Sequence, residues 1–167
     1  SSVVLLPVTV DEAAMVCSQH LDLYEALKTN FQAEVSLHLI TGEEIGEKFM
    51  QSGGRSIRER GLQVGSEVKA DAVLLTTIER CEERIGSKLG VAHPAAVGMT
   101  LQLLRVVDGQ ELWRASYAVS DRALSEDLLN LNRRLSNKPG WRSSSDLIRE
   151  GMRSAASEFE SRRKAHF

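Results

Sequence analysis

The sequence has few of the residues that mark disulfide-stapled, membrane-spanning or nucleic-acid-binding proteins. Two of its 167 residues are cysteine, too few for a disulfide framework, and they leave the redox compartment open. Lys and Arg (21) nearly balance Asp and Glu (23), so no net charge favours nucleic acid or an anionic membrane. The apolar runs are too short for a spanning helix. What is left is an ordinary globular chain, long enough to fold around its own core.

The motifs of familiar enzymes are missing as well. The sequence contains no Gly-x-Ser-x-Gly, no His-Glu-x-x-His and no Cys-x-x-Cys, and its Gly-x-x-x-Gly spacings lead to no phosphate-binding loop. Glu79, Glu82 and Glu83 alternate with arginines, and we interpret them as solvated surface charges rather than an acid–base pair. We therefore expect no enzymatic activity, no cofactor and no metal, with an unrecognised hydrolase as the last alternative.

The most regular pattern lies in residues 95–119. Two alternating apolar segments flank Val107-Asp108-Gly109-Gln110, which predicts an antiparallel hairpin. A two-residue Asp-Gly turn would set the apolar side of one arm against the polar side of the other. A three-residue turn with Gly109 in the left-handed conformation makes one face apolar throughout. This register pairs Leu103 with Trp113, Leu101 with Ala115, and Met99 with Tyr117.

The remaining elements follow from hydrophobic periodicity. Strands are predicted over residues 3–8, 34–40 and 72–79, and the first and third of these are continuously apolar at their cores. Five helices are predicted: over residues 11–29, 41–53 and 56–69, near 125–131, and from about Ser144. The second begins with a capping box, Thr41-Gly42-Glu43-Glu44, and ends at Gly53. The third contains glycines that suggest close packing. Residues 80–94 are predicted to form a surface loop or an irregular hairpin connection.

This order of elements predicts a single α/β domain over residues 1–167. The two continuously apolar strands belong at the centre of the sheet, which gives a mixed five-stranded sheet of order 2-1-3-4-5. Right-handed crossovers place the first helix on one face and the next two helices on the other. The last helix then covers the apolar face of the C-terminal hairpin.

Several residues are candidates for a site. We interpret Cys17 and His20 as a core cysteine and a partly buried histidine, with a metal pair as the weaker alternative. His93 precedes Pro94 at the mouth of the hairpin, either as part of a turn or as a ligand contact. Trp141 lies in a basic stretch, either against the core or on a phosphate or glycan. The candidate ligand or partner contacts are His93, Arg114, Arg134, Lys138, Trp141 and Arg142.

Three stretches resemble a group of bacterial envelope lipoproteins. They are Val3-Val4-Leu5-Leu6-Pro7, residues 65–75 with Ala70-Asp71-Ala72-Val73-Leu74, and residues 94–117 with Leu101-Gln102-Leu103-Leu104-Arg105-Val106. The group includes the curli-secretion lipoprotein and the lipoprotein activators of penicillin-binding proteins. Residues 124–152 are similar to uncharacterised lipoproteins of the same type.

The resemblance implies a periplasmic domain that is tethered to the outer membrane and acts through protein contacts. The chain starts with Ser1 and has no acylated cysteine before Val3, so we expect a targeting segment upstream in the full-length protein. The expected partner is an envelope protein, with no nucleic acid and with the membrane reached only through a lipid anchor; an oligomer is compatible with this. The alternative is a small-molecule or glycan-binding module. Pore formation is not expected, because the long insertions that build a transmembrane barrel are absent.

Overall fold

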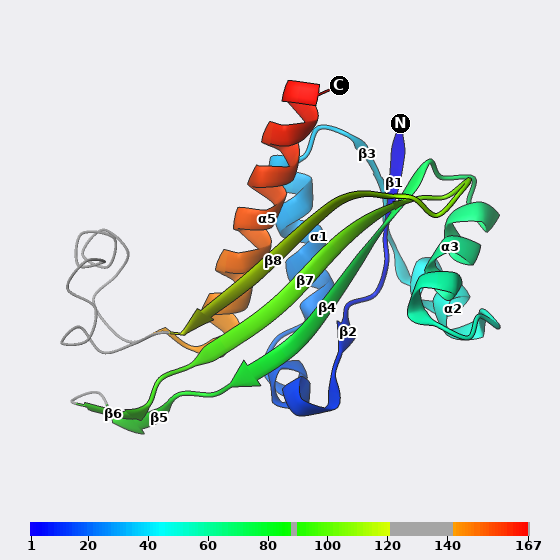
Figure 1. The fold of residues 1–167 in the computed structure, drawn as a ribbon. Coiled ribbons are helices and arrows are strands. Elements are labelled where there is room, and N and C mark those ends of the chain that lie inside the picture. Colours follow the sequence, from blue (N-terminus) through cyan, green and yellow to red (C-terminus); the bar gives the residue numbers. More distant parts are fainter. Residues whose placement is uncertain (88–89, 121–141, 167) are drawn as a thin grey trace.

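A mixed sheet runs through the centre of the computed structural model, which describes residues 1–87, 90–120 and 142–166 (Figure 1). The strand order is β3-β1-β4-β7-β8, and β2 also pairs with β4. β1 is parallel to β3 and β4, whereas β7 is antiparallel to its two neighbours, β4 and β8. The predicted fold class and the order 2-1-3-4-5 are confirmed. The strands are β1 (Ser2–Leu5), β2 (Thr9–Val10), β3 (His38–Ile40), β4 (Ala72–Glu82), β7 (Ala96–Arg105) and β8 (Glu111–Ser120).

Helices cover the two faces of the sheet unequally. One face packs against η1 (Glu12–Gln19), α1 (Leu23–Glu34) and the long α5 (Ser144–His166), and this side holds the larger hydrophobic core. The other face packs against α2 (Glu43–Gln51) and α3 (Ile57–Glu67) over a smaller core. The predicted placement of the first helix opposite the next two is therefore confirmed, as is the last helix over the hairpin.

The β7–β8 register is the predicted one. Leu103 pairs with Trp113, Leu101 with Ala115, and Met99 with Tyr117, and Gly109 has a φ of 71°. The turn itself is longer than predicted, because the Arg105 N–H donates to the Gln110 carbonyl at 2.8 Å and four residues lie between them. A bulge after Leu103 absorbs the extra residue and restores the apolar alignment.

The predicted helix over residues 11–29 is wrong. The chain forms the 3-10 helix η1, breaks, and starts α1 afresh, running on to Glu34. The Asp22 carboxylate accepts a hydrogen bond from the Glu25 N–H at 3.0 Å, which caps the second helix. The spacing of the apolar residues gives no sign of this cap, because it continues from one helix into the next. His20, predicted to be partly buried, is exposed beside the break.

Two further predictions in this region are corrected. The strand predicted over 34–40 is shortened to β3, because α1 continues through Glu34 and Val35 closes it. The capping box does not form: α2 follows Gly42 at a φ of 136°, with no side-chain cap. Gly42 instead donates its N–H to the Tyr24 hydroxyl at 3.2 Å. A positive φ of this kind favours glycine over any residue with a side chain.

The rest of the chain follows the sequence closely. Gly61 and Gly65 allow α3 to lie close against the sheet. A Cβ added at Gly61 would come within 2.6 Å of Leu6, and a Cβ added at Gly65 would come within 2.5 Å of Val73. The predicted irregular connection is a short hairpin of β5 (Ile85–Ser87) and β6 (Gly90–His93). The helix predicted near 125–131 lies outside the described residues.

Candidate functional site

The end of the sheet formed by β4, β7 and β8 has one face that α2 and α3 do not reach. Those helices cover the residues near the turn, Val73, Leu75 and Leu104, which form the smaller core. Beyond them the same face carries polar side chains, and in Figure 1 these strands pass in front of α1 and α5 with none of the described helices before them. We call this surface the open half-face. It comprises Thr77, Glu79, Thr100, Gln102, Glu111, Arg114 and Ser116.

Cross-strand rows organise the open half-face. Thr77 on β4 pairs with Thr100 on β7, which pairs in turn with Ser116 on β8, so a row of hydroxyl groups crosses the sheet. The Thr100 hydroxyl donates to a Glu79 carboxylate oxygen at 2.7 Å. Glu79 follows the inward-pointing Ile78 and so lies on the same side as Thr77. Strand alternation thus places all these groups on one side.

Charged groups lie beside this row and hold one another in place. The Arg114 guanidinium donates to both oxygens of Glu111, at 3.1 and 3.0 Å, and the Gln102 amide donates to Glu111 at 2.8 Å. The Arg114 hydrogen bonds, followed by that of Gln102, hold the pKa of Glu111 below its usual range. Both charges therefore persist at physiological pH, and the surface presents fixed carboxylates next to a fixed guanidinium.

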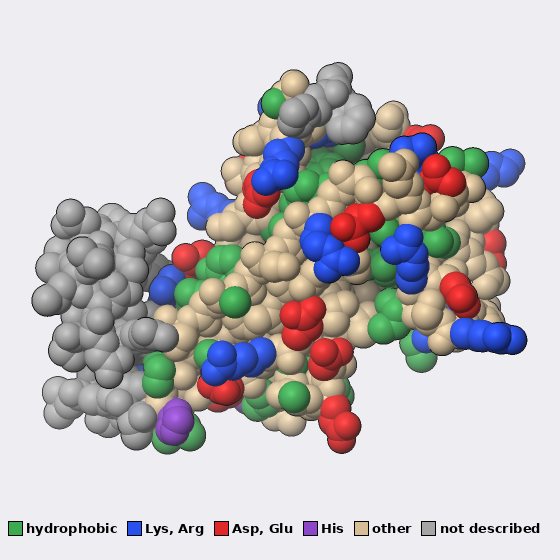
Figure 2. All heavy atoms as spheres, viewed as in Figure 1, with side chains coloured by type: hydrophobic (Ala, Val, Ile, Leu, Met, Phe, Trp, Pro, Cys, Tyr) green, Lys and Arg blue, Asp and Glu red, His purple; other side chains and the backbone are tan. Residues whose placement is uncertain are grey.

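The open half-face has the chemistry of a polar protein interface. It mixes donors and acceptors and carries both signs of charge, visible as adjoining blue and red groups at the centre of the molecule in Figure 2. Protein interfaces are rimmed and bridged by groups of this kind, whereas nucleic-acid sites are strongly basic. Among the described residues, no cluster of His, Cys, Asp and Glu could hold a metal ion. In the same part of the chain, no helix combines the length and apolar character of a membrane span.

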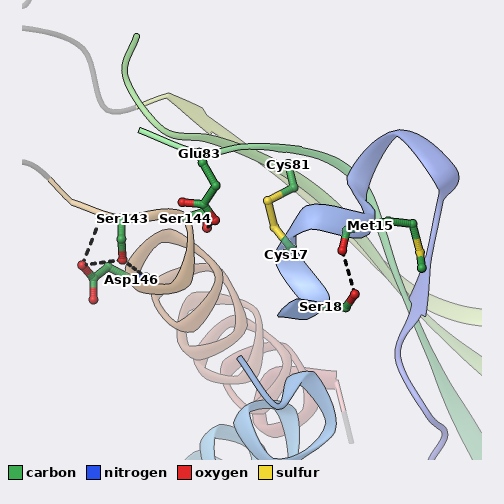
Figure 3. The surroundings of a disulfide bond; sticks show 8 residues. All are labelled: Met15, Cys17, Ser18, Cys81, Glu83, Ser143, Ser144 and Asp146. Atoms are coloured by element: carbon green, nitrogen blue, oxygen red, sulfur yellow. Dashed lines mark hydrogen bonds between the residues drawn. A yellow bond between two sulfur atoms is a disulfide. The ribbon is translucent and has the colours of Figure 1, made fainter. Parts of the chain in front are cut away.

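A disulfide fixes the far end of the same sheet. Cys17 on η1 and Cys81 on β4 are bonded, with their Cα atoms 5.9 Å apart and a separation of 64 in the sequence (Figure 3). Both are buried, at 1% and 4% exposure. The prediction of a core cysteine is thus confirmed for Cys17. The metal alternative fails, because its thiol is consumed by the disulfide.

The β4 bulge explains why Cys81 can reach Cys17. Strict alternation after the buried Ile78 would turn residue 80 toward the larger core and residue 81 away from it. The bulge adds one residue, so Arg80 stays exposed and Cys81 points inward. Close by, the Ser144 hydroxyl at the start of α5 donates to Glu83 (Figure 3). The disulfide and this hydrogen bond therefore hold η1 and α5 to neighbouring residues at the end of β4.

A pocket of about 350 Å³ lies next to this junction. Its described lining is Glu82, Glu83, Ile85 and His93. His93 is exposed at the end of β6, and Ile85 is 60% exposed. Two carboxylates and an imidazole would favour a small cationic ligand.

The structure separates the candidate contacts proposed from sequence. Arg114 pairs with Gln102, six positions along β7 from Ala96, so His93 lies about 20 Å away and one small ligand cannot touch both. Arg142 lies on the α5 side, where it pairs with Glu150. Arg134, Lys138 and Trp141 lie outside the described residues. Of the candidates that the structure describes, Arg114 alone belongs to the open half-face.

Sequence reasoning missed most of the open half-face. Thr100 and Gln102 were recognised as the polar side of a strand, but nothing in the sequence indicated that the covering helices stop short of them. The sequence predicts Glu79 as one of several adjacent solvated charges, and no local pattern indicates its hydrogen bond with Thr100. The useful clue was the length of the elements. β4 and β7 have eleven and ten residues, whereas α2 and α3 have nine and eleven. Because a strand rises about twice as far per residue as a helix, the two helices are too short to cover the strands from end to end.

Comparisons with known proteins yield structural matches only. No family model matches the chain, and no curated protein matches it. The PelC dodecamer from Paraburkholderia phytofirmans has a TM-score of 0.58 at 13% identity, and the match covers 95% of this chain and 86% of the PelC chain. The hypothetical protein CT253 from Chlamydia trachomatis has a TM-score of 0.57 at 13% identity, covering 96% of both chains.

LpoB of Escherichia coli also shares the fold. Its solution structure has a TM-score of 0.51 at 17% identity, and the match covers 72% of this chain and 56% of LpoB. At such identities the likeness concerns the fold. The resemblance to envelope lipoproteins is therefore confirmed at that level, and the chain has an envelope-lipoprotein-like α/β fold.

Proposed function

We propose that the chain is a non-enzymatic docking domain of the bacterial cell envelope, which binds another envelope protein through the open half-face. One observation carries this proposal: a sheet face with an ordered set of hydroxyl, carboxylate and guanidinium groups is covered by none of the helices that the structure describes. The groups are already held in position, so binding would cost little side-chain entropy. Nothing in this arrangement pairs a nucleophile with a histidine base.

The disulfide supports the proposed location. Structural disulfides persist in the bacterial periplasm and are rare in the cytosol. A buried Cys17–Cys81 bond therefore favours the periplasmic side of the envelope. We further propose that an N-terminal lipid tethers the full-length protein to the outer membrane. PelC, which shares the fold, is a dodecamer, so assembly with other copies is included in the proposal.

Photo-cross-linking in living cells tests the docking surface. A photoreactive amino acid is placed at Gln102, within the open half-face, or at Ser154, exposed on the outer side of α5. We expect Gln102 to form one discrete adduct with an envelope protein, and Ser154 to form none. The proposal would be falsified if both positions gave the same adducts, or if Gln102 gave none while the protein was abundant.

The pocket at His93 supports a second candidate function, the binding of a small cationic molecule between Glu82 and Glu83. A thermal-shift screen of amines and amino sugars tests it. A ligand at about a hundred times its Kd adds about 2.7 kcal/mol of stability. A shift that His93→Ala leaves unchanged would place the ligand elsewhere.

A further inference from the structure

Among the described residues, β8 is a long edge strand whose second half has little protection against pairing. The opposite edge of the sheet, β3, has three residues, whereas β8 has ten. Natural edges are blunted by charged side chains, especially lysine, and by proline, bulges, short length or a covering segment. In β8 the charged residues, Glu111 and Arg114, and the bulge all lie in the half near the turn. β8 contains no Lys, Pro or Gly, and its last six residues, 115–120, are uncharged. In the described part of the chain, β8 pairs with β7 alone.

The direction of the β8 main-chain groups follows from two hydrogen bonds. The Arg105 N–H donates toward β8, to the Gln110 carbonyl at 2.8 Å, and the Val106 N–H donates to the other side, to Asp71 at 3.0 Å. Odd-numbered residues of β7 therefore point their main-chain groups at β8. Their β8 partners are also odd-numbered. Beyond the bulge at Leu112, the even-numbered β8 residues Arg114, Ser116 and Ala118 consequently present N–H and C=O groups outward.

The side chains of β8 define which strand fits there. On the α5 side, Ala115, Tyr117 and Val119 are only half-buried against the larger core. On the other side, Arg114 and Ser116 are exposed. An added strand must therefore alternate apolar with polar residues, in the same phase. β8 itself has this pattern, so a second copy of the chain carries a matching strand.

We propose that two copies of the chain associate by antiparallel pairing of their β8 strands, with Ala115 on the two-fold axis. Each Arg114 then lies opposite Ser116 of the other copy. These two residues point their main-chain groups outward, and the two symmetry-related pairs form about four main-chain hydrogen bonds. On the α5 side, Trp113 pairs with Tyr117.

Other in-phase registers are less favourable. An axis on residue 114 sets the two Arg114 side chains against each other, and like charges directly opposite destabilise a sheet. An axis on residue 116 sets the Arg114 guanidinium opposite Ala118, which offers no side-chain acceptor, whereas an axis on Ala115 sets it opposite the Ser116 hydroxyl. The axis on Ala115 avoids both faults.

Pairing has a consequence for the surface described above. The two sheets become one, and side-chain phase puts both open half-faces on the same side of it. The pair would then offer a continuous two-fold docking surface. This consequence rests on the proposed function, but the pairing does not.

Sedimentation equilibrium over a range of protein concentrations tests the pairing, with Ser116 as the probe. Ser116→Lys places a lysine opposite Arg114 twice in the pair, and we expect the dimer to weaken about ten-fold. Ser116→Glu places a carboxylate opposite Arg114, and the dimer should tighten by a similar factor. Ser154→Lys and Ser154→Glu on α5 are the matched controls and should change nothing.

Three results would overturn the pairing. One is a protein that remains monomeric up to its solubility limit. Another is a dimer whose dissociation constant is unchanged by both Ser116→Lys and Ser116→Glu. The third is a dimer that Ser116→Lys and Ser116→Glu weaken equally, which would place residue 116 of one copy opposite residue 116 of the other. Failure of docking would appear instead as missing adducts at Gln102, a residue of the neighbouring strand β7.

Discussion

At the scale of single residues, the fold depends on a few close contacts that leave no freedom for substitution. Gly65 is one of them, because α3 lies against the sheet at this point. A Cβ there would come within 2.5 Å of Val73 and 2.7 Å of Val106. Real Cβ atoms do not approach so closely, so helix and sheet must separate if the glycine is replaced.

We expect Gly65→Ala to lower the free energy of unfolding by about 1–3 kcal/mol through overpacking. Gly53→Ala is the matched control: nothing lies within 4 Å of its added Cβ, and the variant should be neutral or slightly more stable. Urea denaturation measures both. Equal stability of the two variants would mean that α3 is not packed so tightly.

Glu160 is the other decisive residue, since it is a carboxylate with 6% exposure on α5. Arg163 donates two hydrogen bonds to it, at 2.9 and 2.8 Å, and Ser36 donates another from the loop after α1. The Arg163 hydrogen bonds, with help from Ser36 and Lys164, hold the pKa of Glu160 well below its usual range. The cluster joins the C-terminal helix to the loop that leads into β3.

Glu160→Gln should lower the free energy of unfolding by about 2 kcal/mol at neutral pH. Because the folded pKa is depressed, the wild type holds this stabilisation above the ordinary carboxyl pKa and loses it as the pH falls below that value. The difference between wild type and variant should therefore shrink at about pH 3. Glu158→Gln, on an exposed carboxylate of the same helix, should have little effect at either pH.

At the scale of elements, the sequence predicted strands better than helix boundaries. The alternation of residues 95–119 determined the β7–β8 register, since one wrong step would have buried Arg114. Periodicity failed at the first helix, because η1 and α1 share an apolar stripe although Asp22 caps a new helix between them. The bulges in β4 and β8 were not predictable either, as an inserted residue disturbs no composition.

The disulfide belongs to this scale, because it ties η1 to β4 across the larger core. Replacing both Cys17 and Cys81 with alanine should lower the free energy of unfolding by about 4 kcal/mol, the value expected from freeing a loop of this length in the unfolded chain. Denaturation of the oxidised protein, with and without reductant, provides the comparison. Two titratable thiols in protein isolated from its native compartment would contradict the bond.

At the scale of the whole molecule, the sheet order and the separation of helices between two faces could be predicted from continuous and alternating apolar runs. The site could not. It depends on how far α2 and α3 extend over β4 and β7, a matter of lengths and packing that no local pattern records. The apolar strands and the Leu101–Val106 stretch suggested an envelope-lipoprotein-like fold, and the structure has it.

The proposed location makes a prediction about the full-length protein. Purified from its native membranes, it should carry a diacylated cysteine a short way upstream of Ser1, because a tether would hold the domain at the outer membrane. Mass spectrometry of the mature N-terminus measures this. An unmodified N-terminus on a cytosolic protein would contradict the location and favour the pocket at His93.

The most direct test of docking is co-purification of the tagged full-length protein from native envelopes. Gln102→Trp puts a bulky side chain in the middle of the open half-face, where strands tolerate aromatic residues, and Ser154→Trp puts the same side chain on α5. With both variants as stable as wild type, Gln102→Trp should lose the partner that cross-links at this position, and Ser154→Trp should retain it. Equal recovery by the two variants would contradict docking through the open half-face.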